Sequence, residues 1–348
     1  MDDGSLVELP PELSSPQPSS DARYVMGVDG GATKTLAAVL DLHEHTIHLG
    51  HGGPSNEDAV GAQAAVKELL GAADEAIAQA GVDASELGSA VLAIAGTDTA
   101  DVARNVRAQR SQAWLVVNDV VGAWATVTGG GPGVAAIAGT GSNVFGVGGE
   151  GEHVRAWRAG GWGHLLGDEG SGYWLGVQSI KAALRHREAS GPATALSAAA
   201  VEFFGEQSVE AVAQSVYTKP LTKGEIAAFA VHTARLAEQG DAVARELYEL
   251  GARELGAQIA AVVDKTGLAE EASGPFPVGL IGSAWKAGAV FLDPLLSVIH
   301  GFAPRARVSI VSMAPVGGSL LLAMRACGAA DAVAPEQLSQ LIDRALDC

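Results

Sequence analysis

The residues best suited to chemistry lie in one glycine-rich stretch near the middle of the chain, Gly160–Trp174. Six glycines there surround Trp162 and the adjacent carboxylates Asp168 and Glu169, and a helix is predicted to begin at Ser171. A carboxylate accepts hydrogen bonds from paired sugar hydroxyls, and an aromatic face packs against a sugar ring. A loop that only caps a helix needs neither a tryptophan nor paired carboxylates. The stretch therefore predicts a sugar-binding loop in which Asp168 and Trp162 take those two roles.

The same stretch contains His164. No second histidine or cysteine follows at the spacing of a metal site, so we do not expect His164 to bind a metal ion. The role of Glu169 stays open.

A third carboxylate, Asp119, follows Asn118 between a predicted buried strand, Ala113–Asn118, and a predicted helix, Val120–Thr128. Open α/β sheets bind their ligands at the carboxyl ends of such strands. A carboxylate there can accept the proton of a hydroxyl group to which a phosphoryl group is transferred. It can equally cap the helix, a contact worth about 1 kcal/mol. We favour the general base because other motifs of the chain indicate phosphate and sugar binding.

A glycine turn near the N-terminus, Gly27–Thr35, is a candidate phosphate loop. Its small residues let backbone amides approach a phosphate, Thr33 can add a hydroxyl, and Asp29 can hold Mg²⁺ directly or through water. A strand follows the glycines, which excludes a Rossmann loop, and no Gly-Lys-Ser/Thr ends the run as in a Walker loop. An ordinary Asp-Gly hairpin turn is the alternative.

Two further turns resemble the first in composition. Gly139-Thr140-Gly141 lies between two predicted strands and could hold the other side of a polyphosphate, although it too fits an ordinary hairpin. Gly282-Ser283 follows a strand and begins a helical segment, where adenine or a phosphate could bind, or where the chain simply turns.

The two halves of the chain repeat one order of predicted elements, separated by a turn at Gly129–Pro132. Each half opens with a hairpin and a third strand and continues with helices and strands. The first half has predicted strands at 24–28, 35–41, 46–52, 89–95 and 113–118, and helices at 57–80, 99–108 and 120–128. The second half has predicted strands at 134–138, 143–147, 154–158, 277–281 and 307–311, and helices at 171–187, 193–204, 209–217, 223–238, 241–266 and 335–346. The repeat predicts a duplicated α/β architecture.

The composition of the 348 residues limits the ligands. Lys and Arg number 22 against 40 Asp and Glu, a net charge of −18, which disfavours nucleic acids and anionic membranes. An anionic ligand must therefore be held by backbone amides, a metal ion or a few cations. The 45 glycines are roughly twice the average share and gather around the turns described above.

Two cysteines, Cys327 and Cys348, exclude a disulfide framework and predict thiols in a reducing cytoplasm. Residues 1–23 are acidic and rich in Pro and Ser, which predicts a disordered tail and not a signal peptide. The uncharged stretch Val120–Gly149 is long enough for a membrane span, but its ten glycines and a proline predict strands and turns.

Taken together, these motifs resemble the actin-like superfamily of sugar kinases, actin and heat-shock chaperones. Within it the chain is similar to the N-acetylglucosamine kinase branch of the BadF/BadG-type ATPase family. The resemblance runs from about Tyr24 to Ala329 and is most specific in Gly160–Trp174. It implies duplicated actin-like (ribonuclease H-like) α/β domains with an interdomain cleft. The implied domains are 24–130 and 131–333, the second with a helical insertion, followed by a C-terminal helix at 334–348 able to pack back on the first domain.

The resemblance also implies roles for individual residues. Asp119 matches the catalytic base, and Mg²⁺ is expected near Asp29. The implied sugar-binding residues are Asn56, Asp119, Thr140, Gly161, Trp162 and Asp168. The implied nucleotide-binding residues are Asp29, Gly30, Gly31, Thr33, Lys34, Gly139, Thr140, Gly141, Gly282 and Ser283. The chain departs from the family at Ala32, where relatives often carry a third glycine, and at Val120 and Val121, which replace smaller residues.

The implied activity is transfer of a phosphoryl group from ATP, with Mg²⁺, to the 6-hydroxyl of an amino sugar, first N-acetylglucosamine. Glucosamine, N-acetylmuramic acid or glucose fits the same motifs. An ATPase activator of a CoA-ester dehydratase is a rival, but it would need cysteines within the body of the fold for an iron–sulfur cluster. A non-catalytic sugar sensor is opposed by the joint presence of Asp29, Asp119 and Asp168. The two cysteines predict a cytoplasmic protein, the expected partners are ATP and a small-molecule sugar, and the family is compatible with a homodimer.

Overall fold

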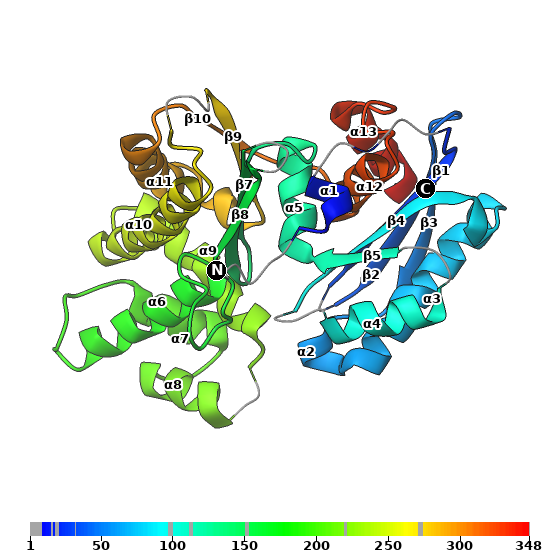
Figure 1. Cartoon of the computed structure of the whole chain (residues 1–348). Helices are drawn as coiled ribbons and strands as arrows, with labels where there is room; N and C mark the ends of the chain where they lie inside the picture. Colours follow the sequence, from blue (N-terminus) through cyan, green and yellow to red (C-terminus); the bar gives the residue numbers. More distant parts are fainter. Residues whose placement is uncertain are drawn as a thin grey trace.

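The computed structural model describes residues 9–14, 17, 21–31, 33–96, 100–110, 114–149, 153–218, 221–270 and 274–347. Ala32, Ala113 and Cys348 lie outside these ranges, as do residue 99 of a predicted helix and residues 1–8, 15, 16 and 18–20 of the predicted tail. Figure 1 shows two lobes, each built on one sheet, with helix α5 (Asp119–Thr128) standing between them.

The first sheet has the strand order β3-β2-β1-β4-β5. Strands β1, β2 and β3 are antiparallel neighbours, and β4 and β5 continue the sheet parallel to β1. Its strands are β1 (Tyr24–Gly30), β2 (Thr35–Asp41), β3 (Thr46–Gly52), β4 (Leu87–Ile94) and β5 (Trp114–Asn118). The second and third predicted strands are confirmed at both ends.

The second sheet repeats this plan in the order β10-β9-β6-β7-β8. Strands β6, β7 and β8 are antiparallel neighbours, and β9 and β10 extend the sheet parallel to β6. Its strands are β6 (Gly133–Ala138), β7 (Ser142–Gly148), β8 (Arg155–Gly160), β9 (Phe276–Ile281) and β10 (Ala306–Ile310). The matching strand orders confirm the predicted duplicated α/β architecture.

Helices cover both sheets. Beside α5, the first lobe has α2 (Glu57–Val60), α3 (Ala62–Ala80), the 3₁₀ turn η1 (Ala84–Glu86) and α4 (Ala100–Gln109). The prediction of one continuous helix over 57–80 was wrong, because Gly61 has a φ of 80° and interrupts it. The second lobe has α6 (Gly172–Arg187), α7 (Leu196–Phe204), α8 (Val209–Thr218), α9 (Lys223–Glu238), α10 (Ala242–Lys265), the 3₁₀ turn η4 (Ala284–Ala287) and α11 (Ala289–Phe302).

After β10 the chain returns to the first lobe. Helix α12 (Pro315–Ala326) packs on the first sheet, where the Ser319 hydroxyl donates a hydrogen bond of 2.8 Å to the Val28 carbonyl oxygen. A Cβ at Gly27 would lie 2.6 Å from the Leu320 nitrogen, so the glycine permits this close approach. Helix α13 (Pro335–Leu346) lies next to β3.

Of the predicted disordered tail, residues 1–23, the structure describes only 9–14, 17 and 21–23. Residues Pro11–Ser14 form the short helix α1, and Leu13 is buried against the core that contains α12. The Leu13 carbonyl oxygen accepts a hydrogen bond of 2.8 Å from Arg325 Nε. One apolar side chain and one backbone acceptor thus hold this part of the segment on the first lobe.

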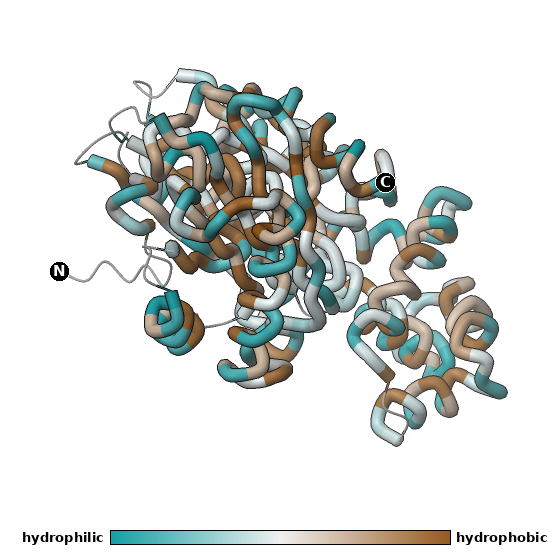
Figure 2. The backbone as a smooth tube through the Cα atoms, turned by 90° about the vertical axis from the view of Figure 1, so that its right-hand side faces the viewer, coloured by the Kyte–Doolittle hydropathy of each residue, from teal (hydrophilic) through white to brown (hydrophobic). Residues whose placement is uncertain are grey.

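Apolar side chains fill the space between sheets and helices. One core cluster includes both Trp124 of α5 and Phe145 of β7, which pack edge to face at 6.0 Å between ring centroids. In Figure 2 hydrophobic and hydrophilic residues alternate along the helical segments, as expected for helices with one face on a core. Cys327 belongs to the same core, and its thiol contacts the Met324 carbonyl oxygen. Among the described residues, no helix is long and apolar enough to cross a membrane.

Candidate active site

A cavity of about 380 Å³, here called the cleft cavity, lies between the two lobes. All six residues predicted to bind a sugar line it. The first lobe supplies residues that follow β3, β4 and β5, and the second supplies the β6–β7 turn, the segment after β8 and the start of α9. Its lining is Asn56, Ala95, Gly96, Asp119, Ile137, Gly139, Thr140, Gly141, Ser142, Asn143, Gly161, Trp162, Gly163, Asp168 and Lys223.

Asp119 is the first residue of α5, directly after β5. The side chain of Asn118 is the helix cap, since its Oδ1 accepts a hydrogen bond of 3.2 Å from the Val120 amide. The Asn118 amide group also donates to the Gly96 carbonyl oxygen at 2.8 Å, which fixes the end of β5 against the segment after β4. The capping role that competed with general-base chemistry thus belongs to the preceding residue.

The carboxyl group of Asp119 has a raised pKa of about 7. Burial is the largest cause, because it disfavours the charged form, and the nearby negative charge of Asp29 adds to it. Contact with the Val120 amide and the charge of Arg158 act in the opposite direction. A carboxyl group with this pKa is suited to proton transfer near neutral pH.

Asp29 lies near the carboxyl end of β1. Strand β4 separates β1 from β5, the strand that Asp119 follows. Burial raises its pKa to about 6, and the charge of Lys34 lowers it. No group of three or more His, Cys, Asp or Glu side chains that could hold a metal ion occurs in the described part of the chain. Mg²⁺ typically uses one or two carboxylates together with substrate phosphates and water, and the half-buried Asp29 fits that mode.

Two asparagines bring buried acceptors to the cleft cavity. The Oδ1 atoms of Asn56 and Asn143 are buried and find no hydrogen-bond partner among the described residues. Asn56 precedes α2 but does not cap it with its side chain. Because buried acceptors in proteins are normally paired, these two atoms are candidate acceptors for a polar ligand in the cleft cavity.

Asp168 is held in an unusual backbone conformation, with a φ of 63°, and its side chain is buried. Its Oδ1 accepts a hydrogen bond of 3.1 Å from the Ser142 amide. A Cβ at Gly141 would lie 3.0 Å from the same oxygen, which explains the glycine there. The carboxylate is therefore fixed at the wall of the cavity by the β6–β7 turn.

Trp162 is 52% exposed and lines the cleft cavity, so one face remains available to a ligand. The guanidinium of Arg158 lies 5.4 Å from its ring centroid, a cation–π contact. Gly161 before it has a φ of 72°, and a Cβ there would lie 2.7 Å from the Asn143 side chain. Two features thus position Trp162: the cation–π contact with Arg158 of β8, and the absence of a side chain at Gly161, where a Cβ would collide with Asn143.

A second cavity of about 440 Å³, here called the helix cavity, lies within the second lobe. It shares Gly139 and Thr140 with the cleft cavity. Ser283 lines it, and Gly282, with a φ of 112°, brings the turn after β9 against the β6–β7 turn. Its lining is Gly139, Thr140, Gly172, Leu175, Gly224, Ala227, Ala228, Ala230, Val231, Ala234, Tyr248, Ser283, Ala284, Lys286 and Ala287.

The first glycine turn lines neither cavity in the described part of the chain. Gly31 closes the turn by donating to the Lys34 carbonyl oxygen at 3.0 Å, and Thr33 and Lys34 are exposed. A Cβ at Gly30 would lie 2.6 Å from Ser55 Oγ, which explains that glycine by packing. Asp29 is the residue of this turn that affects the cleft cavity, because its negative charge raises the pKa of Asp119 in the cavity wall.

The two residues whose roles were open have structural contacts. Glu169 accepts a hydrogen bond of 3.0 Å from Gln258 Nε2, and its carbonyl oxygen accepts one of 2.9 Å from the Ser142 hydroxyl. His164 packs edge to face against Tyr173 at 5.2 Å. Both contacts hold the glycine-rich stretch against its surroundings.

Sequence reasoning missed three residues of this region: Asn143, Arg158 and Lys223. Asn143 directly follows the predicted β6–β7 turn, and its signal was a polar side chain at the start of a buried strand. Arg158 and Lys223 are among the few cations of an acidic chain, but nothing in their spacing links them to the turns. Only the fold brings them to the cleft.

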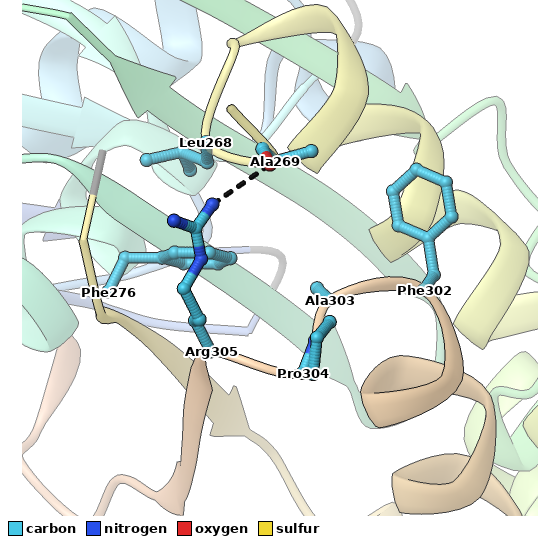
Figure 3. A pocket seen from close by; sticks show the side chains of 7 residues that line it. All are labelled: Leu268, Ala269, Phe276, Phe302, Ala303, Pro304 and Arg305. Atoms are coloured by element: carbon cyan, nitrogen blue, oxygen red, sulfur yellow. Dashed lines mark hydrogen bonds between the residues drawn. The ribbon is translucent and has the colours of Figure 1, made fainter. Parts of the chain in front are cut away.

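A further cavity, of about 530 Å³, is separate from these two (Figure 3). Arg305 lines it and donates hydrogen bonds to the carbonyl oxygens of Ala269 and Glu270. No predicted site residue is among its lining residues, which are Leu268, Ala269, Phe276, Phe302, Ala303, Pro304 and Arg305.

Comparisons with known proteins agree with this geometry. The chain is 33% identical over 249 residues to a Clostridium acetobutylicum protein named N-acetylmuramic acid/N-acetylglucosamine kinase, a match that covers 70% of this chain and 80% of the relative. It is 27% identical over 316 residues to the N-acetyl-D-glucosamine kinase of Dictyostelium discoideum, covering 86% and 97% of the two chains.

A crystal structure described as a candidate N-acetylglucosamine kinase of Chromobacterium violaceum superposes with a TM-score of 0.66 at 25% identity, over 87% of this chain and 100% of that chain. The sequence profile of the BadF/BadG/BcrA/BcrD ATPase family matches residues 26–323. The predicted resemblance is confirmed: the chain belongs to the BadF/BadG/BcrA/BcrD ATPase family.

Proposed function

We propose that the protein is an ATP-dependent sugar kinase that phosphorylates the 6-hydroxyl of an amino sugar, with N-acetylglucosamine as the preferred acceptor. The relatives named as kinases of N-acetylglucosamine and N-acetylmuramic acid support the substrate class. The observation that carries the proposal is that Asp119, with a pKa of about 7, shares one cavity with Trp162 and Asp168.

In the proposed complex the sugar occupies the cleft cavity. Trp162 packs against the ring, and Asp168 accepts hydrogen bonds from hydroxyl groups. The side chains of Asn56 and Asn143 present buried acceptors that have no hydrogen-bond partner among the described residues, and these take donors from the sugar hydroxyls or an N-acyl group. Thr140 and Gly161 complete the wall.

ATP occupies the helix cavity, with adenosine next to Ser283 and the phosphates directed past Gly139 and Thr140 toward the cleft cavity. The sharing of these two residues by both cavities supports this path. Mg²⁺, when bound near Asp29, neutralises phosphate charge. The described residues of the first turn border neither cavity, and the Gly31 amide already donates to the Lys34 carbonyl oxygen, so Asp29 is the residue of this turn that the proposal uses.

Asp119 accepts the proton of the attacking hydroxyl. The hydroxyl oxygen forms a bond to the γ-phosphorus, and the bond from that phosphorus to its bridging oxygen breaks, releasing ADP. Burial of Asp119 favours the neutral product of proton transfer, so the same desolvation that raises its pKa also drives this step.

A coupled assay of ADP release across N-acetylglucosamine, N-acetylmuramic acid, glucosamine and glucose tests the proposal. We expect the highest kcat/KM with N-acetylglucosamine. Asp119→Asn should lower kcat by at least about 10²-fold, because it removes the proton acceptor while keeping the shape. Phosphorus and proton NMR of the product identify the modified hydroxyl. Undiminished turnover by Asp119→Asn would contradict the assignment of the base.

A further inference from the structure

Lys223 is the first residue of α9 and the one cation that lines the cleft cavity in the described part of the chain. The residue after it, Gly224, lines the helix cavity together with the next turn of α9. The two cavities therefore meet at two places, at Gly139 and Thr140 on one wall and at the start of α9 on the other. A group that moves from one cavity to the other therefore passes between Thr140 and the start of α9.

The ammonium group of Lys223 is available for a ligand. The neighbouring acid, Glu225, is occupied by the helix cap: its Oε2 accepts hydrogen bonds of 2.7 Å from the Thr222 amide and 2.8 Å from the Thr222 hydroxyl. The Thr222 hydroxyl in turn accepts one of 3.2 Å from the Glu225 amide. No ion pair or hydrogen bond joins the Lys223 side chain to another side chain within the described ranges, and the residue is exposed.

Few charged residues line the two cavities, so few side chains can bind the phosphoryl group during its transfer. The charged residues that line them are Asp119, Asp168, Lys223 and Lys286. Lys286 lines only the helix cavity, and the half-buried Arg158 stacks on Trp162. Arg158 and Lys34 act on Asp119 and Asp29 through their charges but do not line either cavity, so Lys223 is the cation that lines the cleft cavity in the described part of the chain.

We propose that Lys223 is a catalytic residue that binds the γ-phosphoryl group of ATP and stabilises its charge during transfer to the sugar. This rests on the proposed kinase function and adds a residue to it. Positive charge fixed near the transferred phosphoryl group is a principal source of rate in phosphoryl transfer. Placement at the start of α9 adds the favourable end of the helix dipole to the lysine charge.

The test compares Lys223→Met, Lys223→Arg and the control Lys181→Met, which removes an exposed lysine of α6 in the same lobe. We expect Lys223→Met to lower kcat on the order of 10²-fold. Isothermal titration should give sugar and ADP affinities within about twofold of the unchanged protein, and a preference for ATP over ADP reduced about tenfold. Lys223→Arg should recover most of both losses, and Lys181→Met should behave as the unchanged protein.

A Lys223→Met variant with a kcat within threefold of the unchanged protein, and with the same preference for ATP over ADP, would overturn the proposal. So would a loss confined to the KM of N-acetylmuramic acid, because it would assign the lysine to a sugar carboxylate. If the unchanged protein transferred no phosphate to any sugar, the kinase proposal would fail, and the ATP and ADP affinities would still decide whether Lys223 contacts the γ-phosphate.

Discussion

The carboxylate of Asp168 and the amide of Ser142 form a hydrogen bond of 3.1 Å that joins the glycine-rich stretch after β8 to the start of β7. One side chain thus holds two segments of the cleft cavity in register. No hydrogen bond to its second oxygen occurs within the described ranges, and in the proposed function that oxygen accepts one from a sugar hydroxyl.

Asp168→Asn should separate these two functions. Asparagine tolerates the left-handed backbone of this position and keeps an oxygen for the Ser142 amide, so we expect a nearly unchanged Tm. It loses the charge that strengthens hydrogen bonds from sugar hydroxyls, so KM should rise about 10- to 100-fold. Asp168→Ala loses both contacts and should lower Tm as well. Equal Tm losses in the two variants would show that the charge serves folding alone.

The pH dependence of kcat/KM should follow Asp119. The base acts in its ionised form, and its pKa is about 7, so kcat/KM should rise with pH through neutrality and level off above about pH 8. Asp29, with a pKa of about 6, adds to the loss at acidic pH. Initial rates between pH 5 and 9 measure the profile. A flat profile in this range would contradict the role of Asp119.

Asp119→Asn should also stabilise the fold at alkaline pH. Because the pKa is raised from 3.8 to about 7 on folding, the stability that comes from the protonated form is complete only below pH 3.8 and is lost progressively as the pH rises to about 7. The neutral amide avoids this loss, so we expect a Tm higher by about 2 °C at pH 8, from on the order of 1 kcal/mol. Near pH 4 the difference should vanish. Calorimetry at both pH values provides the comparison.

Arg158→Met should shift the pH profile of kcat/KM that was predicted from Asp119. Its charge favours ionised Asp119, so its loss should shift the acidic limb of kcat/KM to higher pH. Loss of the cation–π contact should also free Trp162 and raise KM for the sugar severalfold. Arg158→Lys keeps the charge and should restore the position of the limb. A packing role alone would change KM and leave the profile in place.

Gly161→Ala and Gly163→Ala form a matched pair, since both glycines have a positive φ, 72° and 78°. A Cβ at Gly161 would lie 2.7 Å from the Asn143 side chain, whereas one at Gly163 meets nothing within 4 Å. Both variants bear the backbone cost of about 1–2 kcal/mol. Gly161→Ala must also displace Asn143, so its Tm should fall further. Thermal unfolding of both variants tests this, and equal losses would show that the contact does not constrain Asn143.

Much of the fold could be predicted from short-range patterns. Continuous apolar runs bounded by Asp-Gly and glycine turns indicated β1, β2 and β3, and the same pattern after Gly133 indicated the repeat. Short-range patterns could not predict that α12 packs on the first sheet. It depends on Ser319 and Leu320 reaching Val28 and Gly27, contacts nearly three hundred residues apart in the chain.

The residues of the cleft cavity were predictable where a side chain needed for chemistry stood inside a recognisable turn, as Asp168 and Trp162 do. Arg158 was not, because its neighbours in sequence are ordinary strand residues and its contact with Trp162 arises from the bend at Gly160 and Gly161. Lys223 was hidden for a similar reason: it begins an amphipathic helix, where an exposed lysine is common.

The position of α12 determines when the first lobe can be complete. Residues 24–128 form their sheet and α5, but the face that receives α12 stays uncovered until Pro315–Ala326 has been synthesised. A chain cut between β5 and β6 would therefore give two fragments, one with an exposed apolar face and one with an unattached apolar helix. During synthesis, the first lobe has to wait for nearly the whole chain to leave the ribosome.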